Sequence, residues 1–544
     1  MSDLQTNAVL DSAHIGDIRG AFGTIKLDDH GPRFGLWARL KTLFAILGPG
    51  LIVMVGDNDA GAFSTYAQAG QNHGTALLWT LALLIPVLYV NQEMVLRLGA
   101  VTGVGHARLI LERFGKFWGA FSVIDLFILN ALTIVTEFIG ISLGLEYLGL
   151  PKVLGICVAA LLIMLTAGTG DFRRFERFSL ILVAGSFLLI PVFIMVHPPI
   201  SAVVHDFIIP RMPTNAPLAD VMILIIGIVG TTVAPWQLFF QQSYVIDKRI
   251  TPRFIRYERI DLWLGIIVVI VGAVAIMASM AHLFEGTVEA GKFVDAGTVA
   301  AGLEKYYGRL PGVLFAIALI DASIIGASAI SLSTAYALGD LLSMKHSLHR
   351  KPGEAKGFYA VFCGLIVISG ALVAIPGVPL GLLTNAVQTL AGILLPSAAV
   401  FLLLLCNDKQ VLGPWVNGRF TNFMTVIIVA ILVILSIVLT TAVVFPDISA
   451  ERILQIMAGG CILALILGLA GMTLQAHRQA SVKTPQDWDI KPTRKQLDSW
   501  RMPPLDTLQP NVMTTSTRIW MGLLRGYLLV AVLMVIYKIV QMAL

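Results

Sequence analysis

The chain has 544 residues, of which 57% are apolar and 13% are charged, and its mean hydropathy is +0.83. So few charged residues cannot cover a soluble core of this length, which excludes an ordinary water-soluble globular protein. The net charge of +5 is spread over the loops and excludes a nucleic-acid-binding surface. The four cysteines lack the spacing of a metal knuckle and imply no disulfide framework.

Residues 1–42 are polar and mixed in charge, so we expect a cytoplasmic N-terminal tail without a cleavable signal peptide. Apolar runs of about 20 residues follow, the length that a helix needs to cross a bilayer. Because lipid offers the backbone no hydrogen-bond partners, we expect α-helices, about eleven to thirteen of them, in an all-α membrane protein. The candidate spans lie near 43–70, 74–100, 118–147, 152–169, 177–196, 218–246, 258–283, 310–341, 357–375, 380–406, 422–445, 452–475 and 522–543.

Lysine and arginine concentrate in the even-numbered connections between these spans. The groups are Arg108, Arg113 and Lys116; Arg173, Arg174 and Arg177; Lys248, Arg249, Arg253 and Arg256; and Lys345, Arg350 and Lys351. Because positively charged short loops stay in the cytoplasm, we expect these connections and the N-terminus to be cytoplasmic. The expected location is a bacterial plasma (inner) membrane.

Glycine and proline interrupt two of the spans. The first span contains Gly48-Pro49-Gly50 and then the stretch 56–61, and the sixth contains Gly230 and Pro235. Two broken helices five spans apart are typical of transporters with two inverted repeats of five helices, which bind substrate near the midplane beside unwound backbone. Glycine in span six also fits close helix packing alone. The expected divisions are a first repeat at 43–200, a second repeat at 201–410, accessory spans at 411–475, a cytoplasmic polar segment at 476–517 and a possible further span at 518–544.

Two aspartates, Asp57 and Asp59, lie at the centre of the first span, with Asn58 between them. An ionised aspartate in a membrane helix costs several kcal/mol unless it is compensated, and a divalent cation would compensate both charges. The unwound backbone adds carbonyl oxygens at Gly56 and nearby. A proton carrier or a buried structural hydrogen bond is the alternative interpretation of this pair.

These stretches resemble the Nramp family of divalent metal transporters. GPGLIVMVGDNDAGAF, from Gly48 to Phe63, is similar to the family's first helix, where GPG precedes DPGN, and Asp59 falls on the DPGN aspartate. GTTVAPWQL, from Gly230 to Leu238, resembles the family's GATVMPHNL, and Gln388 matches the metal-facing glutamine of helix ten. The resemblance covers roughly residues 40–445. It implies a LeuT-like fold of inverted five-helix repeats and transport by alternating access.

Departures from the family's pattern bear on the ion. Ala62 stands in place of an asparagine ligand, and Ala234 stands in place of a methionine whose thioether contacts the metal. Losing a thioether removes a preference for transition metals, whereas Mg²⁺ keeps several waters and is held by one or two carboxylates. The pattern is similar to that of the Nramp-related magnesium transporters, and it favours Mg²⁺, with Mn²⁺ possible.

The proton route of the family is also altered. Trp236 and Gln241 stand where the family has histidines, and Ile134 stands where it has a proton-accepting aspartate, although Glu137 is kept. We therefore expect passive transport that is uncoupled, or at most weakly coupled, to protons.

The predicted site has three parts. The predicted metal ligands are Asp59, Asp57, Gly56, Val233, Ala234 and Gln388; the predicted pocket lining is Asn58, Ala62, Trp236 and Gln237; and a possible ion or proton path contains Glu137, Gln241 and Asp321. The metal is cargo, and we expect no catalytic activity, no cofactor, no nucleic acid and no obligate protein partner beside the bilayer. Three rivals stand: a proton-coupled Mn²⁺ or Fe²⁺ importer, an amino-acid or organic-cation symporter of the same fold, and a membrane-embedded enzyme.

Overall fold

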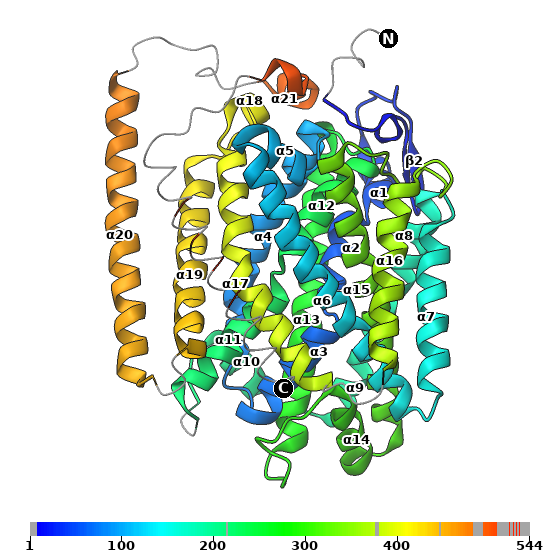
Figure 1. The fold of residues 1–544 in the computed structure, drawn as a ribbon, viewed down its shortest axis with the longest axis vertical. Coiled ribbons are helices and arrows are strands. Elements are labelled where there is room, and N and C mark those ends of the chain that lie inside the picture. The colour runs from blue at the N-terminus through cyan, green and yellow to red at the C-terminus, as the bar shows by residue number, and fades with distance from the viewer. Residues whose placement is uncertain are drawn as a thin grey trace.

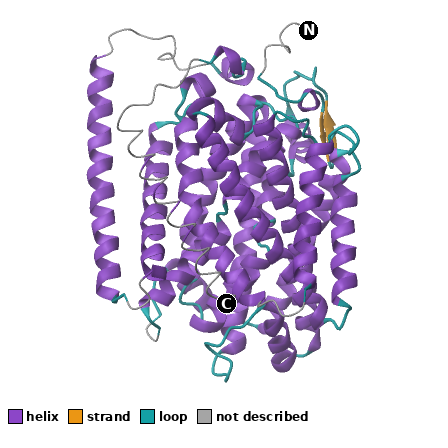
Figure 2. Ribbon diagram, in the orientation of Figure 1, coloured by secondary structure: helices purple, strands orange, loops and turns teal. Residues whose placement is uncertain are grey.

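The computed structural model describes residues 8–213, 216–375, 380–444, 448–481 and 493–508, and the single helical positions 522, 526, 529 and 533. Apart from those four positions, the predicted span at 522–543 lies outside the described residues. The described chain is a bundle of roughly parallel and antiparallel helices (Figure 1). Strand occurs in the described part only as one short hairpin (Figure 2).

Long helices cross the bundle, and shorter ones lie at its two ends or cover part of its depth (Figure 1). They are α1 (Gly35–Ile46), α2 (Pro49–Val55), α3 (Ala60–His73), α4 (Leu78–Thr102), α5 (His106–Phe114), α6 (Lys116–Tyr147), α7 (Lys152–Ala167), α8 (Phe172–Gly185), α9 (Leu189–Val196), α10 (Ile200–Ile208), α11 (Leu218–Thr232), α12 (Pro235–Asp247), α13 (Ile255–Phe284), α14 (Ala296–Tyr307), α15 (Arg309–Leu342), α16 (Lys356–Ala374), α17 (Leu380–Cys406), α18 (Lys409–Leu412), α19 (Arg419–Val444), α20 (Ala450–Ser481) and α21 (Arg494–Ser499). We call the end that carries the hairpin, α5 and α21 the hairpin end, and the end that carries α10 and α14 the vestibule end (Figure 1).

Nine spans of the described residues are long and apolar enough to cross a membrane, and a tenth follows if the bent pair α1 and α2 is one span. The shorter apolar helix α7 lies where the fourth span is expected. The described helices therefore confirm a polytopic all-helical architecture.

The first predicted span consists of three helices. α1 and α2 meet at a bend of 51° beside Gly48, whose φ of 153° requires glycine, and Pro49 then occupies the first turn of α2. α2 ends at Gly56, and α3 begins at Ala60. The break therefore falls where the glycines and aspartates predicted it. α1 begins at Gly35, earlier than the predicted start of the span at 43.

The sixth predicted span breaks as well. α11 ends at Thr232, Val233 and Ala234 have extended or irregular backbone, and α12 restarts at Pro235. Proline suits this first helical position, because the missing N–H would have no partner there. α11 and α17 pack closely through glycines, since a Cβ on Gly230 would lie 2.4 Å from the backbone nitrogen of Gly392.

Residues 8–31 fold against the bundle. They form an antiparallel hairpin of β1 (Ile18–Gly20) and β2 (Gly23–Ile25), in which Ile18 pairs with Ile25. A Cβ on Gly20 would lie 1.9 Å from the carbonyl oxygen of Ala45, so the hairpin lies directly on α1. Much of the predicted tail at 1–42 is thus ordered structure on the hairpin end.

Candidate metal site and vestibule

Asp59 stands between the two halves of the first broken span and caps α3. Its Oδ1 accepts a hydrogen bond from the Ala62 N–H at 2.9 Å, and only 2% of the residue is exposed. A carboxylate at a helix N-terminus is stabilised by the free N–H groups and by the helix dipole. This setting provides partial compensation for a buried charge at the centre of the bundle.

Glu137 of α6 joins Asp59 at the same helix terminus. Its Oε2 accepts from the Ala60 N–H at 3.2 Å, next to the Ala62 N–H that donates to Asp59. Gly326 of α15 leaves room for both, since a Cβ there would lie 2.8 Å from Glu137 Oε2 and 3.0 Å from Asp59 Cβ. Two carboxyls at one helix terminus repel each other when both are ionised, and a bound cation would relieve that repulsion.

The break leaves backbone carbonyls without their regular helical partners. The Ala60 and Ala62 N–H groups, which would bond Gly56 and Asn58 in a continuous helix, donate to carboxylates instead. In the second break, Pro235 has no N–H, and the Gln237 N–H donates to Ala234 at 3.2 Å and not to Val233. The carbonyls at both breaks are thereby freed to serve as neutral oxygen ligands.

Asp57 does not share the helix cap with Asp59. Its Oδ1 accepts a hydrogen bond from Gln237 Nε2. The Oε1 of Gln237 in turn accepts from Gln92 Nε2 of α4 at 3.0 Å. Asp57 Oδ2 is buried and has no hydrogen-bond partner among the described residues. One oxygen of Asp57 is therefore held by an amide chain, and the other is unused.

Asn58 points away from Asp59 toward α13, where its Nδ2 donates to the Val269 carbonyl at 3.0 Å. Gly272 makes this possible, because a Cβ there would lie 2.4 Å from the same nitrogen. Trp236 packs over the first break, with its ring 3.6 Å from a Cβ built on Gly56. The predicted lining role thus has geometric support for Trp236, whereas Asn58 fixes the break to α13.

Gln388 of α17 lies directly over the start of α3. A Cβ on Gly61 would fall 1.7 Å from Gln388 Nε2, so the amide reaches this place only because residue 61 is glycine. Gln388 is 3% exposed, and its Nε2 has no hydrogen-bond partner among the described residues. Gln388, the predicted ligand from helix ten, therefore lies against Gly61, and Gly61 follows Asp59 by two residues in the chain.

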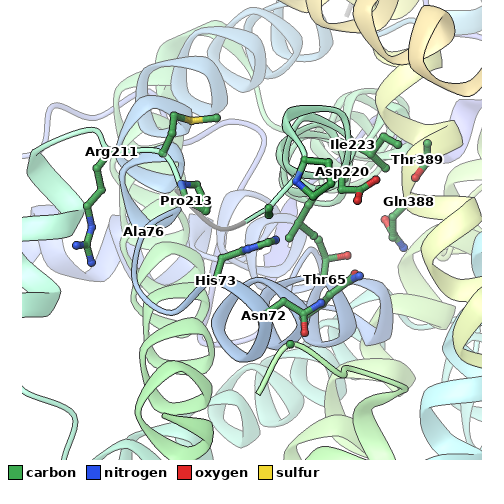
Figure 3. A pocket seen from close by; sticks show the side chains of 17 residues that line it. Thr65, Asn72, His73, Ala76, Arg211, Pro213, Asp220, Ile223, Gln388 and Thr389 are labelled. Atoms are coloured by element: carbon green, nitrogen blue, oxygen red, sulfur yellow. The ribbon is translucent and has the colours of Figure 1, made fainter. Parts of the chain in front are cut away.

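A cavity of about 940 Å³ opens above Gln388 toward the vestibule end. We call it the vestibule; Figure 3 shows side chains of α3, α11 and α17 converging on it. Its lining mixes polar and apolar residues, and the polar ones include Thr65, Gln68, Asn72, His73, Asp220 and Thr389. Gln388 lines the cavity and also covers Gly61. The vestibule therefore reaches the side chain that lies next to the start of α3, where Asp59 is the cap.

The methyl side chains of Ala62 and Ala234 are buried near the two breaks. Gln241 lies on α12, with both amide atoms buried and unpaired among the described residues. Asp321 of α15 lies elsewhere, since it packs against Gly185 of α8, where a Cβ would be 2.4 Å from its carboxyl. The structure thus brings Glu137 to the site but places Asp321 against another helix.

Sequence reasoning missed several polar side chains of this region. Thr65, Gln68 and Asn72 line the vestibule from one face of α3, and their spacing of three and four residues was the available signal. Gln92 supports Gln237 from 145 residues away, and no local pattern indicates such a contact. Thr231 is buried one residue before the end of α11 at Thr232, and its Oγ1 has no hydrogen-bond partner among the described residues.

The described residues contain no group of three or more His, Cys, Asp or Glu side chains that could hold a metal ion. Any ion at the breaks would depend on one or two carboxylates, on carbonyl and amide oxygens and on water.

A protein-family model described as "Natural resistance-associated macrophage protein-like" (Nramp) matches residues 50–442, which include both breaks, Glu137 and Gln388. The chain belongs to the Nramp family. The match spans most of the chain and confirms the resemblance seen in the two broken spans.

The similar proteins share low sequence identity with this chain, but the similarity extends over most of both chains. A divalent metal cation transporter MntH of Latilactobacillus sakei is 27% identical over 74% of this chain and 90% of its own length. One of Ralstonia nicotianae is 28% identical over 72% and 88%. A manganese transporter of Eremococcus coleocola has a solved structure similar to this one, with a TM-score of 0.63, 20% identity, and coverage of 83% of this chain and 99% of that one. This likeness confirms the predicted inverted-repeat fold.

Proposed function

We propose that this Nramp protein moves divalent metal ions across a membrane by alternating access. The observation that carries the proposal is Asp59, a buried carboxylate at a helix break near the vestibule, with Gln388 lining the vestibule and contacting Gly61. Freed carbonyls at both breaks supply the neutral oxygens that hard cations bind. The names of the bacterial relatives, divalent metal cation transporters, support the same cargo.

The hairpin end is the cytoplasmic end in this proposal. Its connections hold Lys248, Arg249, Arg253, Arg173 and Arg350, as positively charged cytoplasmic loops do. The vestibule then faces outward. An inside-negative potential favours entry of a divalent ion by about 4.6 kcal/mol at 100 mV.

The finer proposal is that the preferred cargo is Mg²⁺ with part of its water shell, and that Mn²⁺ is a weaker substrate. Few side chains at the break offer a metal ligand: Asp59 and Glu137 share one helix cap, and the methyl side chains of Ala62 and Ala234 offer none. A site with so few ligands suits an ion that gives up its waters reluctantly. The absence of a thioether at Ala234 removes a soft ligand that would favour Mn²⁺.

The second candidate is proton-coupled Mn²⁺ transport. The placement of Asp59 and Glu137 at one helix terminus favours it, because two neighbouring carboxyls can share a proton that cation binding would release. The likeness to a manganese transporter is consistent with it. Against it stand Trp236 and Gln241, which cannot relay protons at neutral pH as histidine can.

Uptake into proteoliposomes, followed with dyes for Mg²⁺ and for internal pH, separates the two. We expect Mg²⁺ entry without acidification, and a rate that rises with inside-negative potential. Mn²⁺ entry with acidification, in the absence of Mg²⁺ entry or competition by Mg²⁺, would establish the second candidate. Failure of both ions to enter, with folded protein, would refute divalent metal transport itself.

A further inference from the structure

The N-terminal segment 8–31 crosses the hairpin end and bonds to three separate connections of the bundle. We call it the N-terminal strap. It contains the hairpin of β1 and β2, it leads into α1, and it is therefore joined covalently to the first broken span.

The first anchor is the connection that follows the second broken span. Arg249 donates from Nε to the Ala13 carbonyl at 2.9 Å and from Nη1 to the Asp17 carbonyl at 3.0 Å. Arg253 donates to the Asp29 and Gly31 carbonyls at 2.5 and 2.6 Å. Both arginines therefore hold the strap through its backbone.

The second anchor is the start of α8. The Ala21 N–H donates to Glu176 Oε2 at 2.5 Å, and Arg177 Nε donates to the Ala21 carbonyl at 2.9 Å. Arg173 donates to the hydroxyl of Thr24. The same Glu176 accepts from Lys248 Nζ at 2.6 Å, which also donates to the last carbonyls of α1, so the strap completes a buried charged cluster.

The third anchor is the connection between α15 and α16. Asp11, which is 3% exposed, accepts from Arg350 Nη2 at 2.6 Å and from the His346 N–H at 2.9 Å. Burial alone would raise the pKa of Asp11, but Arg350 and the backbone N–H groups hold it well below its usual range. His14 adds a contact of 3.0 Å to the His346 carbonyl.

These anchors lie on elements that must separate if a path opens at this end. α1 leads into the first broken span, and Arg249 follows the second, whereas α8 and the α15–α16 connection belong to unbroken spans. A cation released from Asp59 toward the hairpin end has to pass between these two groups of helices. In this structure the strap bridges them with ion pairs and backbone hydrogen bonds.

We propose that the N-terminal strap is a latch that stabilises the state closed at the hairpin end, and that its release sets how readily the path opens there. The inference rests on the proposed function, because it assigns a regulatory step to the transport cycle of the same site. Charge-assisted hydrogen bonds of the kind made by Asp11 are stronger than neutral ones, so losing one set shifts the closed–open equilibrium measurably.

The test uses a buried reporter that becomes accessible when the hairpin end opens. Ala337, 1% exposed, lies on α15 three turns beyond Gly326 and on the same face, and Ala337→Cys in a background without the four native cysteines supplies one thiol. In nanodiscs, Asp11→Asn should raise the rate of thiol modification about tenfold. The matched control is Asp29→Asn, because the hydrogen bonds of the Asp29 carboxylate among the described residues are local: Arg33, just after the strap, donates to it at 2.7 Å, and the Gly31 N–H also donates to it. Equal rates in the two variants would overturn the proposal.

A second variant protects the test against a folding defect in Asp11→Asn. Thr24→Cys with Arg173→Cys replaces a contact between strap and α8 by two thiols, which a short bis-methanethiosulfonate reagent joins and a reductant releases. With an Ala337→Ser control for background labelling, joining the thiols before labelling should slow reporter modification, and reduction should restore it. An unchanged rate would show that the strap is not a latch. The labelling assay contains no metal, so it tests the latch independently of transport. If joining the thiols changes the labelling rate but no ion enters proteoliposomes, only the proposed function is refuted.

Discussion

The contact between Gly61 and Gln388 gives the sharpest test of the site. A methyl group at Gly61 would lie 1.7 Å from Gln388 Nε2, 2.4 Å from its Cδ and 3.0 Å from its Cγ, whereas ordinary contacts begin at 3.4 Å. In Gly61→Ala the amide must therefore leave its place over α3. The fold should survive, because alanine stabilises a helix interior by about 1 kcal/mol relative to glycine.

The expected loss follows from removing one polar partner from a buried site, which costs about 1–3 kcal/mol. Uptake of the preferred ion should show a KM about 5-fold to 150-fold higher, measured in proteoliposomes. Gln388→Ala should have a similar effect by itself. In the double variant the methyl group has room, so Gly61→Ala should add almost nothing.

Gly364→Ala is the matched control, because a Cβ at that glycine of α16 meets nothing within 4 Å. The reasoning is refuted if Gly61→Ala transports normally, or if the losses of the two single variants multiply in the double variant. The second result would mean that Gly61 and Gln388 act independently.

Three further predictions concern charge, softness and pH. Asp59→Asn keeps a side chain that can cap α3 but removes the charge. Uptake should vanish, while the free energy of unfolding should change by less than about 1 kcal/mol. Retained uptake would mean that the cation binds elsewhere. Ala234→Met should raise Cd²⁺ and Mn²⁺ uptake relative to Mg²⁺ by about tenfold in competition assays, and an unchanged ratio would contradict the softness argument. Burial alone lowers the pKa of His346, but the charge and hydrogen bond of Asp340 raise it to about 9. Because the pKa of His346 is higher in the folded than in the unfolded protein, the pair stabilises the fold fully below about pH 6.5, by at most about 3 kcal/mol, and this gain is lost as pH rises through 9. In His346→Gln the free energy of unfolding, measured by thermal unfolding, should decline less over that pH range. An equal decline in variant and parent would exclude the pair as its cause.

Some features follow from local sequence because their physics is local. Apolar runs long enough for a bilayer define the spans, and glycine and proline interrupt a helix wherever they occur, so both breaks were predicted at their observed places. Asp57 and Asp59 were predicted as ligands for the same reason, because a carboxylate in an apolar run needs compensation.

Other features depend on which helices meet, and only the tertiary structure decided them. Asp57 and Asp59 are two residues apart, yet one is held by Gln237 and Gln92 and the other caps α3 with Glu137. Their different surroundings arise because an irregular turn points successive side chains at different helices, and a sequence pattern has no period from which to infer that direction.

The N-terminal strap shows the same limit more strongly. As sequence, residues 1–42 are a polar tail, since they have neither an apolar run nor a helical period. As structure, the part from residue 8 is held by arginines that lie more than 140 residues away along the chain. Such contacts form between polar groups without a repeating pattern. The sequence therefore determined the membrane helices and their two breaks, and only the folded bundle determined which helices and loops the strap joins.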